Sequence, residues 1–228
     1  MNDRFGPARV VVTYDPLIDV ARAYRVSEPE DAAADQGRFG VSGLIHRCNF
    51  LLYDRLDDSL WTQFEGLALT GARSGERLQP IPVRVETLRR WERRHPGTRV
   101  LRPPDSRRID YRYSRYTSYW VSDDVPFPVD HVDARIHPKE LVLGARVGER
   151  TRAYLATVIE RRGGRIVDEL EGRKIRVEWD ASSGTFSFEA PDDVELTSAF
   201  WFAWKSFHPD TELWNVRFEP GDEASLRP

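Results

Sequence analysis

Short runs of alternating apolar and polar residues, separated by turn-forming residues, dominate this chain. The clearest example joins residues 175–179 to residues 185–188 through a hairpin loop, Asp180-Ala-Ser-Ser-Gly184. Such alternation is typical of half-buried antiparallel strands, whereas long helical periods are few. The pattern therefore predicts an α+β fold, mainly β, in which antiparallel sheets form a barrel-like or sandwich arrangement with a few short helices.

Individual elements are predicted from apolar or β-branched runs that are bounded by turn signals. Strands are expected at residues 10–14, 21–26, 40–45, 50–53, 61–70, 100–101, 141–147, 153–159, 175–179 and 185–188. Gly66 lies inside the fifth of these runs and indicates a bulge there. Helices are expected at residues 86–94 and 197–207, and the second of these is rich in aromatic residues.

The length of the chain bears on its domain organisation. A chain of 228 residues can bury a sizeable core and can form one large β-rich domain or two small ones. We expect a single mainly-β domain over residues 1–218 and a frayed tail at residues 219–228. Residues 28–37 are small and polar and fit an excursion between two strands. We find no internal repeat.

Charge and cysteine content bear on the partners and on the cellular location expected for this chain. The chain has 34 basic and 37 acidic residues, a net charge of −3, so no attraction to nucleic acid or to anionic lipid is expected. Cys48 is the only cysteine, which excludes an intramolecular disulfide and favours a cytoplasmic location. No segment is apolar and long enough to cross a membrane. The expected partner is a small molecule, and the oligomeric state is left open.

Aromatic residues are concentrated in residues 200–214. Four of them have helical spacing and form one apolar stripe, at positions 200, 201, 204 and 207. Pro209 disfavours helix at the preceding residue, which places His208 at the C-terminal end of the helix. With Asp210 and Glu212 nearby, His208 suits an acid or base, a metal ligand, or a capping side chain. Core aromatics followed by a capping histidine are the structural alternative.

Six segments, in order along the chain, carry a family resemblance: residues 12–17, 39–44, 52–55, 59–63, 95–98 and 200–213. In these motifs the chain resembles the domain-of-unknown-function family 3179. The resemblance does not imply a biochemical role. It does allow the opening motif of this chain, Val12-Thr-Tyr-Asp-Pro-Leu17, to be compared with the pattern of the family.

The opening motif departs from the pattern of the family that it resembles. Relatives read Thr-Tyr-Cys-Pro-Leu-Cys there, sometimes with selenocysteine second, whereas this chain has Asp15 and Ile18 at the two positions. A Cys-x-x-Cys pair supports dithiol redox chemistry or soft-metal binding. The resemblance therefore implies that any activity here uses another chemistry or has been lost. Cys48 cannot replace the pair by its spacing and is expected to be a small buried hydrophobe.

Asp15 is the first catalytic candidate. It ends a predicted strand, next to Pro16, where the resemblance places a reactive sulfur, so we expect it to point into a pocket. Desolvation by the aromatic residues of the terminal helix would raise its pKa and suit it to general acid or base work. The alternative is a turn-forming aspartate that bonds its own backbone.

The expected active site pairs Asp15 with His208 as acid and base. Gln63 shares one strand face with Trp61, which suits a pocket wall with one amide for orientation, although packing explains both as well. Asp54 is a polar candidate at a strand end, where one of two adjacent residues faces inward. The substrate-binding residues predicted from these arguments are Tyr14, Asp54, Trp61, Gln63, Trp201, Trp204 and Glu212.

These residues predict a cofactor-independent enzyme of the cyclase, isomerase or dehydratase type, acting on a hydrophobic or aromatic small molecule, as in natural-product biosynthesis. A non-catalytic small-molecule-binding protein that has kept the pocket is the first alternative. A metal-dependent oxidoreductase is the second, with His208, Glu212 and Asp15 as ligands. No metal-binding motif, P-loop, dinucleotide fingerprint or G-x-S-x-G motif is found in the sequence, so no cofactor and no metal are expected.

Overall fold

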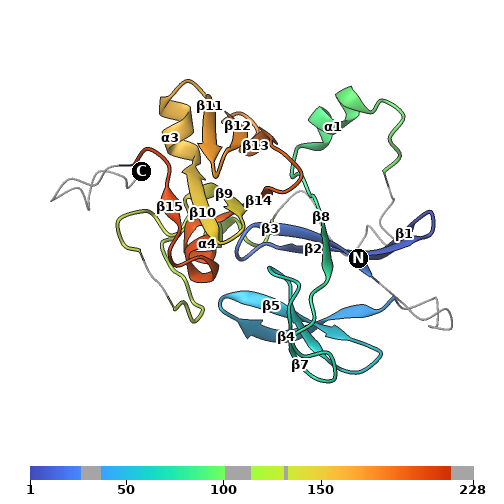
Figure 1. Cartoon of the computed structure of the whole chain (residues 1–228). Coiled ribbons are helices and arrows are strands. Elements are labelled where there is room, and N and C mark those ends of the chain that lie inside the picture. Colours follow the sequence, from blue (N-terminus) through green and yellow to red (C-terminus); the bar gives the residue numbers. More distant parts are fainter. Residues whose placement is uncertain (27–36, 101–113, 131–132, 217–228) are drawn as a thin grey trace.

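The computed structural model describes residues 1–26, 37–100, 114–130 and 133–216. These residues form four sheets of three or four strands, with short helices beside them (Figure 1). The predicted mainly-β, α+β class is confirmed. The barrel-like arrangement is wrong, because no sheet closes on itself within the described residues. Closure around a filled interior takes about eight strands, and each of these sheets has far fewer.

The first sheet has the order β1-β2-β3-β8 and confirms two predicted strands. Its strands are β1 (Asn2–Phe5), β2 (Ala8–Asp15), β3 (Val20–Val26) and β8 (Gln79–Ile81). β2 and β3 form an antiparallel hairpin in which Asp15 is opposite Val20. Along β2 the side chains alternate, so Asp15 is buried while Tyr14 is 47% exposed.

The second sheet has the order β4-β5-β6-β7. Its strands are β4 (Phe39–His46), β5 (Asn49–Asp54), β6 (Leu60–Thr62) and β7 (Ala68–Thr70). The single strand predicted at residues 61–70 is wrong, because the chain turns back after Thr62. Gly66 is required in this turn: its φ is +65°, and a Cβ there would lie 2.6 Å from the Tyr24 ring.

The third sheet has the order β14-β9-β10-β15 and contains β9 (Leu141–Val147), β10 (Arg150–Leu155), β14 (Glu195–Phe200) and β15 (Glu212–Leu213). The strand predicted at 153–159 is wrong in its second half, where α3 (Ala156–Arg161) begins. The helix predicted at 197–207 begins only with α4 (Trp201–Phe207). Residues 197–200 instead pair with β9, where long-range strand pairing outweighs the local helical spacing.

The fourth sheet, β11-β12-β13, contains the predicted hairpin, which is confirmed. Its strands are β11 (Arg165–Leu170), β12 (Arg173–Asp180) and β13 (Thr185–Glu189). The predicted helix at 86–94 is confirmed as α1 (Leu88–Arg94), and α2 (Thr117–Trp120) is an additional short helix. Val100 is not in a strand, which corrects the prediction at 100–101. Residues 27–36, 101 and 219–228, on which three predictions fall, lie outside the described residues.

Three buried clusters hold these sheets together. One lies between the first and second sheets and contains Tyr24 and Trp61, and another lies among α3 and the third and fourth sheets. The remaining cluster contains the aromatic residues of α4 together with Ile18 and Cys48. The first and second sheets therefore share one core, and the third and fourth sheets share another. Among the described residues no helix is long and apolar enough to span a membrane.

Candidate functional site

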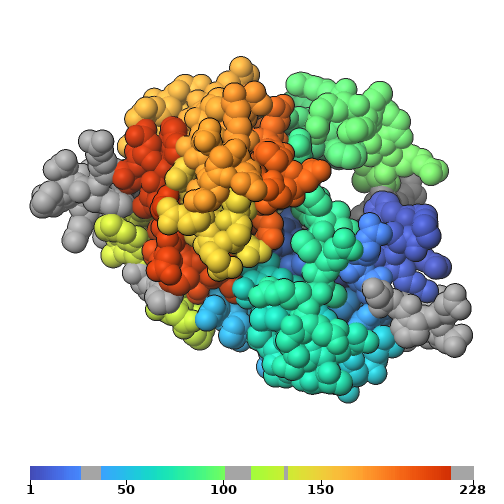
Figure 2. Space-filling view, in the orientation of Figure 1, coloured from blue at the N-terminus to red at the C-terminus, as the bar shows by residue number. Residues whose placement is uncertain are grey.

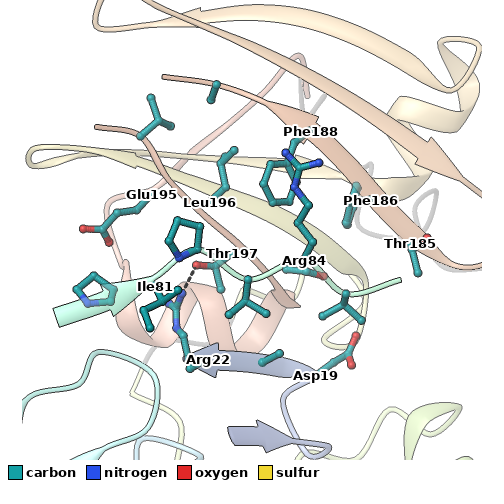
Figure 3. Close-up of a pocket in the computed structure, with 18 of the residues that line it drawn as sticks. Asp19, Arg22, Ile81, Arg84, Thr185, Phe186, Phe188, Glu195, Leu196 and Thr197 are labelled. Atoms are coloured by element: carbon teal, nitrogen blue, oxygen red, sulfur yellow. Dashed lines mark hydrogen bonds between the residues drawn. The ribbon is translucent and has the colours of Figure 1, made fainter. Parts of the chain in front are cut away.

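A pocket of about 310 Å³ opens where the first, third and fourth sheets meet (Figure 3). Its walls come from β3, from β8 and the segment after it, from β13 and from β14. In the space-filling view the green segment that contains β8 and α1 lies beside the orange part of the chain that contains β12 and β13 (Figure 2). The walls are mainly apolar and include Ile81, Val83, Phe186, Phe188 and Leu196. None of the nine predicted site residues lines this pocket.

Arg22 brings a positive charge to the pocket wall. Its Nη1 donates to Thr197 Oγ1 at 2.7 Å, and its Nε donates to the carbonyl oxygen of Phe64 at 2.8 Å. The guanidinium also lies 4.8 Å from the centre of the Phe64 ring. Burial lowers the pKa of Arg22, but a guanidinium stays protonated in proteins. No carboxylate of the described residues forms an ion pair with it.

Four further charged residues line the pocket, namely Asp19, Arg84, Asp192 and Glu195. The Arg84 guanidinium lies 5.1 Å from the centre of the Phe188 ring and so connects the segment after β8 with β13 (Figure 3). Asp19 has a positive φ of 53° in the turn between β2 and β3, and it accepts a 2.7 Å hydrogen bond from the Tyr14 hydroxyl. Burial raises the pKa of Asp19. Tyr14 therefore contacts a residue of the pocket without lining it.

Asp15 lies in a buried polar network next to the β2–β3 turn. Its Oδ1 accepts the Leu17 amide at 3.0 Å, so the turn-forming role is confirmed. Its Oδ2 accepts from Asn49 Nδ2 at 2.9 Å and from the Phe50 amide at 3.3 Å. Burial raises the pKa of Asp15, and these hydrogen bonds oppose the shift. Its catalytic role stays a prediction.

Gln63 belongs to the same network rather than to a pocket wall. Its Oε1 accepts from Asn49 Nδ2 at 2.8 Å, and its Nε2 donates to Thr13 Oγ1 at 3.0 Å and to the Val20 carbonyl at 3.2 Å. Asn49 Oδ1 in turn accepts the Phe64 amide. The side chain is fully buried and its amide is satisfied, as the packing alternative predicted.

His208 ends α4, as predicted, and its ring contacts the ring of Trp204 at a centroid distance of 4.0 Å and an interplanar angle of 44°. Burial, followed by the charges of Arg146 and Arg22, lowers its pKa to about 4, so it is neutral at physiological pH. No contact between His208 and Asp15 is found among the described residues. Phe64 links the Asp15 network to His208. Its amide donates to Asn49 Oδ1, and its ring centroid lies 6.0 Å from that of His208.

The same end-of-helix motif occurs twice in the chain. Trp91-x-x-x-His95-Pro-x-Thr98 at the end of α1 matches Trp204-x-x-x-His208-Pro-x-Thr211 at the end of α4. In both copies the histidine amide donates to the tryptophan carbonyl, the two rings are 4.0 Å apart, and the indole N–H donates to the threonine hydroxyl. Since His95 is exposed and lines no pocket, these contacts are those of a cap.

Four other predicted residues are engaged in packing or ion pairs. Asp54 is fully buried and accepts from Arg38 Nε at 2.8 Å. Trp61 packs edge-on against Phe39 in the core between the first two sheets. Trp201 and Trp204 are each 1% exposed and belong to the α4 core, so they cannot enclose a ligand without movement of that core.

Two predicted residues remain: Glu212, a candidate for substrate binding, and Cys48, expected to be a small buried hydrophobe. Glu212 forms ion pairs with Arg150 and Arg152, and its hydrogen bond from Arg152 is the main cause of its lowered pKa. The part of the chain that the structure describes has no group of three or more potential metal ligands. Cys48 is fully buried, as predicted, and burial raises its pKa to about 12.

Sequence reasoning missed the residues that do line the pocket. The only signal was Arg22 itself, a charged residue between Ala21 and Ala23 on β3. Its hydrogen-bond partner Thr197 falls in a segment that the aromatic spacing assigned to a helix. The convergence of β3, β13 and β14 could not be read from spacing, because their residues lie far apart in the chain.

The comparisons with known proteins identify a family. The model of the family described as "Protein of unknown function (DUF3179)" matches residues 1–193, a segment that ends before β14 and α4. No curated protein and no solved structure matches the chain. Because the matched segment covers well over half of the 228 residues, the chain belongs to the DUF3179 family.

Proposed function

We propose that this protein is a non-catalytic small-molecule-binding protein whose ligand occupies the pocket between β3, β13 and β14. The observation that carries the proposal is the pocket itself. Its volume of about 310 Å³ falls at the lower end of the range for small-molecule sites. Apolar walls with a few polar groups, here Arg22, Arg84 and Thr197, are typical of such sites.

Binding is favoured over catalysis because the predicted acid/base pair, Asp15 and His208, lies outside this pocket. Asp15 is engaged by three N–H donors, and His208 is part of a capping motif that recurs at His95. The arginines that line the pocket orient a ligand well but are poor acids and bases near neutral pH. Binding without turnover is therefore the simpler use of this cavity.

A variant that fills the pocket tests the proposal. Ala21 lines the pocket and is partly exposed, so Ala21→Phe should occupy free volume without disturbing the core. A fragment library is screened by ligand-observed NMR, and hits are measured by calorimetry. Ala21→Phe should weaken binding of the hits about ten-fold or more. Ala72→Phe, at an exposed turn, is the matched control. If fragments bind both variants as they bind the parent chain, the pocket is not the site.

The cofactor-independent acid/base enzyme is the second candidate, and one observation favours it. Asp15 is 1% exposed, and burial raises its pKa, as an acid/base role would require. Titration of the Asp15 carboxyl carbon by NMR tests this candidate directly. A pKa at or below the ordinary value near 3.9 would remove its support.

A further inference from the structure

We infer that the pocket takes an organic carboxylate, whose acid group pairs with Arg22 and whose apolar body lies toward Phe188. This inference rests on the proposed binding function and adds the chemical class of the ligand. The first step of the argument is the charge of Arg22. The second is the shape and polarity of the rest of the pocket.

The guanidinium of Arg22 has N–H donors that no acceptor of the described residues uses. A guanidinium has five N–H donors, and within the described residues two of them are used, by Thr197 Oγ1 and the Phe64 carbonyl. Both acceptors are neutral. Glu195 and Glu65 act on its charge through space, but neither forms an ion pair with it within the described residues. A partly buried cation without a paired carboxylate is unfavourable, and a carboxylate that accepts from the guanidinium fork offsets this cost.

The chain itself shows how a matching arginine is neutralised. Arg22-Ala-Tyr24 on β3 recurs as Arg152-Ala-Tyr154 on β10, and both strands are the second strand of a hairpin. In the second copy, Arg152 and the Tyr154 hydroxyl share one acceptor, the carboxylate of Asp168, and Arg152 also pairs with Glu212.

In the first copy the shared acceptor is not charged. Arg22 Nε donates to the carbonyl oxygen of Phe64 at 2.8 Å, and the Tyr24 hydroxyl lies 2.9 Å from the Gln63 carbonyl oxygen and 3.1 Å from that of Phe64. Within the described chain no carboxylate bonds to the arginine of β3 as Asp168 and Glu212 bond to the arginine of β10. Arg22 lines the pocket, so a ligand can supply that carboxylate.

The other lining charges favour a single negative charge on the ligand. Glu195 is paired with Arg146 at 2.6 Å, whereas Asp19 and Asp192 bring negative charge to the same pocket. A doubly charged phosphate would be repelled by these two aspartates more strongly than a monocarboxylate. Arg84 lies over Phe188 and adds a second positive charge.

The far side of the pocket fits an apolar body. Figure 3 shows Arg22 low in the view and the Arg84–Phe188 pair above it, with Leu196 at the height of Phe188. The Arg84 guanidinium lies 5.1 Å from the centre of the Phe188 ring, and a planar ring of a ligand can stack on either kind of group. An aryl or arylalkyl carboxylate satisfies both sides of the pocket.

Matched acid and amide probes test the inference. Cinnamate with cinnamamide, and indole acetate with indole acetamide, differ in charge but hardly in size. Calorimetry should give about ten-fold or tighter binding for each acid than for its amide. Arg22→Gln should abolish this preference, whereas Arg165→Gln, at an exposed ion pair on β11, should keep it.

A measurement on the unmodified chain covers the case in which Arg22→Gln does not fold. With isotope-labelled arginine, the Nε–H resonance of Arg22 should shift on addition of the acid and not of the amide. Two outcomes would overturn the carboxylate inference and leave the binding function intact. One is equal binding of each acid and its amide. The other is that only neutral fragments bind and that Ala21→Phe weakens their binding. If no compound of the library or the probe set binds, both are overturned.

Discussion

Arg22 on β3 and Thr197 on β14 are 175 residues apart in sequence, and a 2.7 Å hydrogen bond joins their side chains on the wall of the pocket. Next to it, the Phe200 amide donates to the Ile18 carbonyl at 2.9 Å. These two bonds connect the first sheet to the third. The position of the arginine in the pocket thus depends on a contact between distant parts of the chain.

Loss of the Thr197 hydroxyl should destabilise the protein. Thr197→Val keeps the side-chain shape and strand preference but leaves Arg22 Nη1 without its acceptor. A hydrogen bond to a charged group contributes about 1.5–3 kcal/mol, so we expect a loss of about 2 kcal/mol in the free energy of unfolding, measured in urea. Thr151→Val, on β10, is the control. Equal stability of the two variants would show that the bond does not hold Arg22.

Replacement of Asp15 by asparagine should also destabilise the fold. The carboxylate accepts from three N–H groups, whereas an amide presents one oxygen and places its own N–H₂ toward donors. We expect Asp15→Asn to lower the free energy of unfolding by about 1–3 kcal/mol. Asp210→Asn, at an exposed position, should change it by less than about 0.5 kcal/mol. An Asp15→Asn chain as stable as its parent would contradict the structural role.

Acid should weaken the fold through His208. Its pKa falls from about 6.5 to about 4 on folding, so the unfolded chain takes up a proton in a range where the folded chain does not. The stabilisation is therefore complete above pH 6.5 and is lost as the pH falls toward 4.

Phenylalanine variants of the two capping histidines isolate this effect. His208→Phe should flatten the pH dependence of the unfolding free energy over this range by an amount on the order of 2 kcal/mol. His95→Phe removes a histidine with the same cap geometry from an exposed helix end. Its pH profile should follow that of the parent, and identical profiles for both variants would disprove the role of His208.

Replacement of Gly144 by alanine should destabilise the protein. A Cβ at this position of β9 would lie 2.3 Å from the Trp204 ring, so α4 would have to move away from the sheet. Over-packing of this kind costs typically about 1–3 kcal/mol, which should appear as a lower urea midpoint. Gly97→Ala provides the comparison, because a Cβ there meets nothing within 4 Å. A Gly144→Ala chain as stable as Gly97→Ala would show that α4 does not pack as closely as described.

The local roles of several predicted residues could be anticipated from the sequence, whereas the pocket could not. The turn role of Asp15, the cap at His208 and the burial of Cys48 follow from neighbouring residues, because an aspartate before a turn and a histidine before a proline act on the adjacent backbone. The convergence of Asp15 with His208 depends on long-range packing, and the structure instead places each in its own set of contacts.

The sequence by itself determined the mainly-β class, the hairpin of β12 and β13 and the helix ends, because alternation, turn residues and prolines act over a few positions. The tertiary structure alone decided that residues 197–200 form a strand beside β9, that Arg22 meets a neutral carbonyl where Arg152 meets a carboxylate, and that a pocket lies at that junction. Each of these depends on pairs of residues far apart in the chain, whose contacts are set by the packing of whole sheets and leave no periodic signal in the sequence.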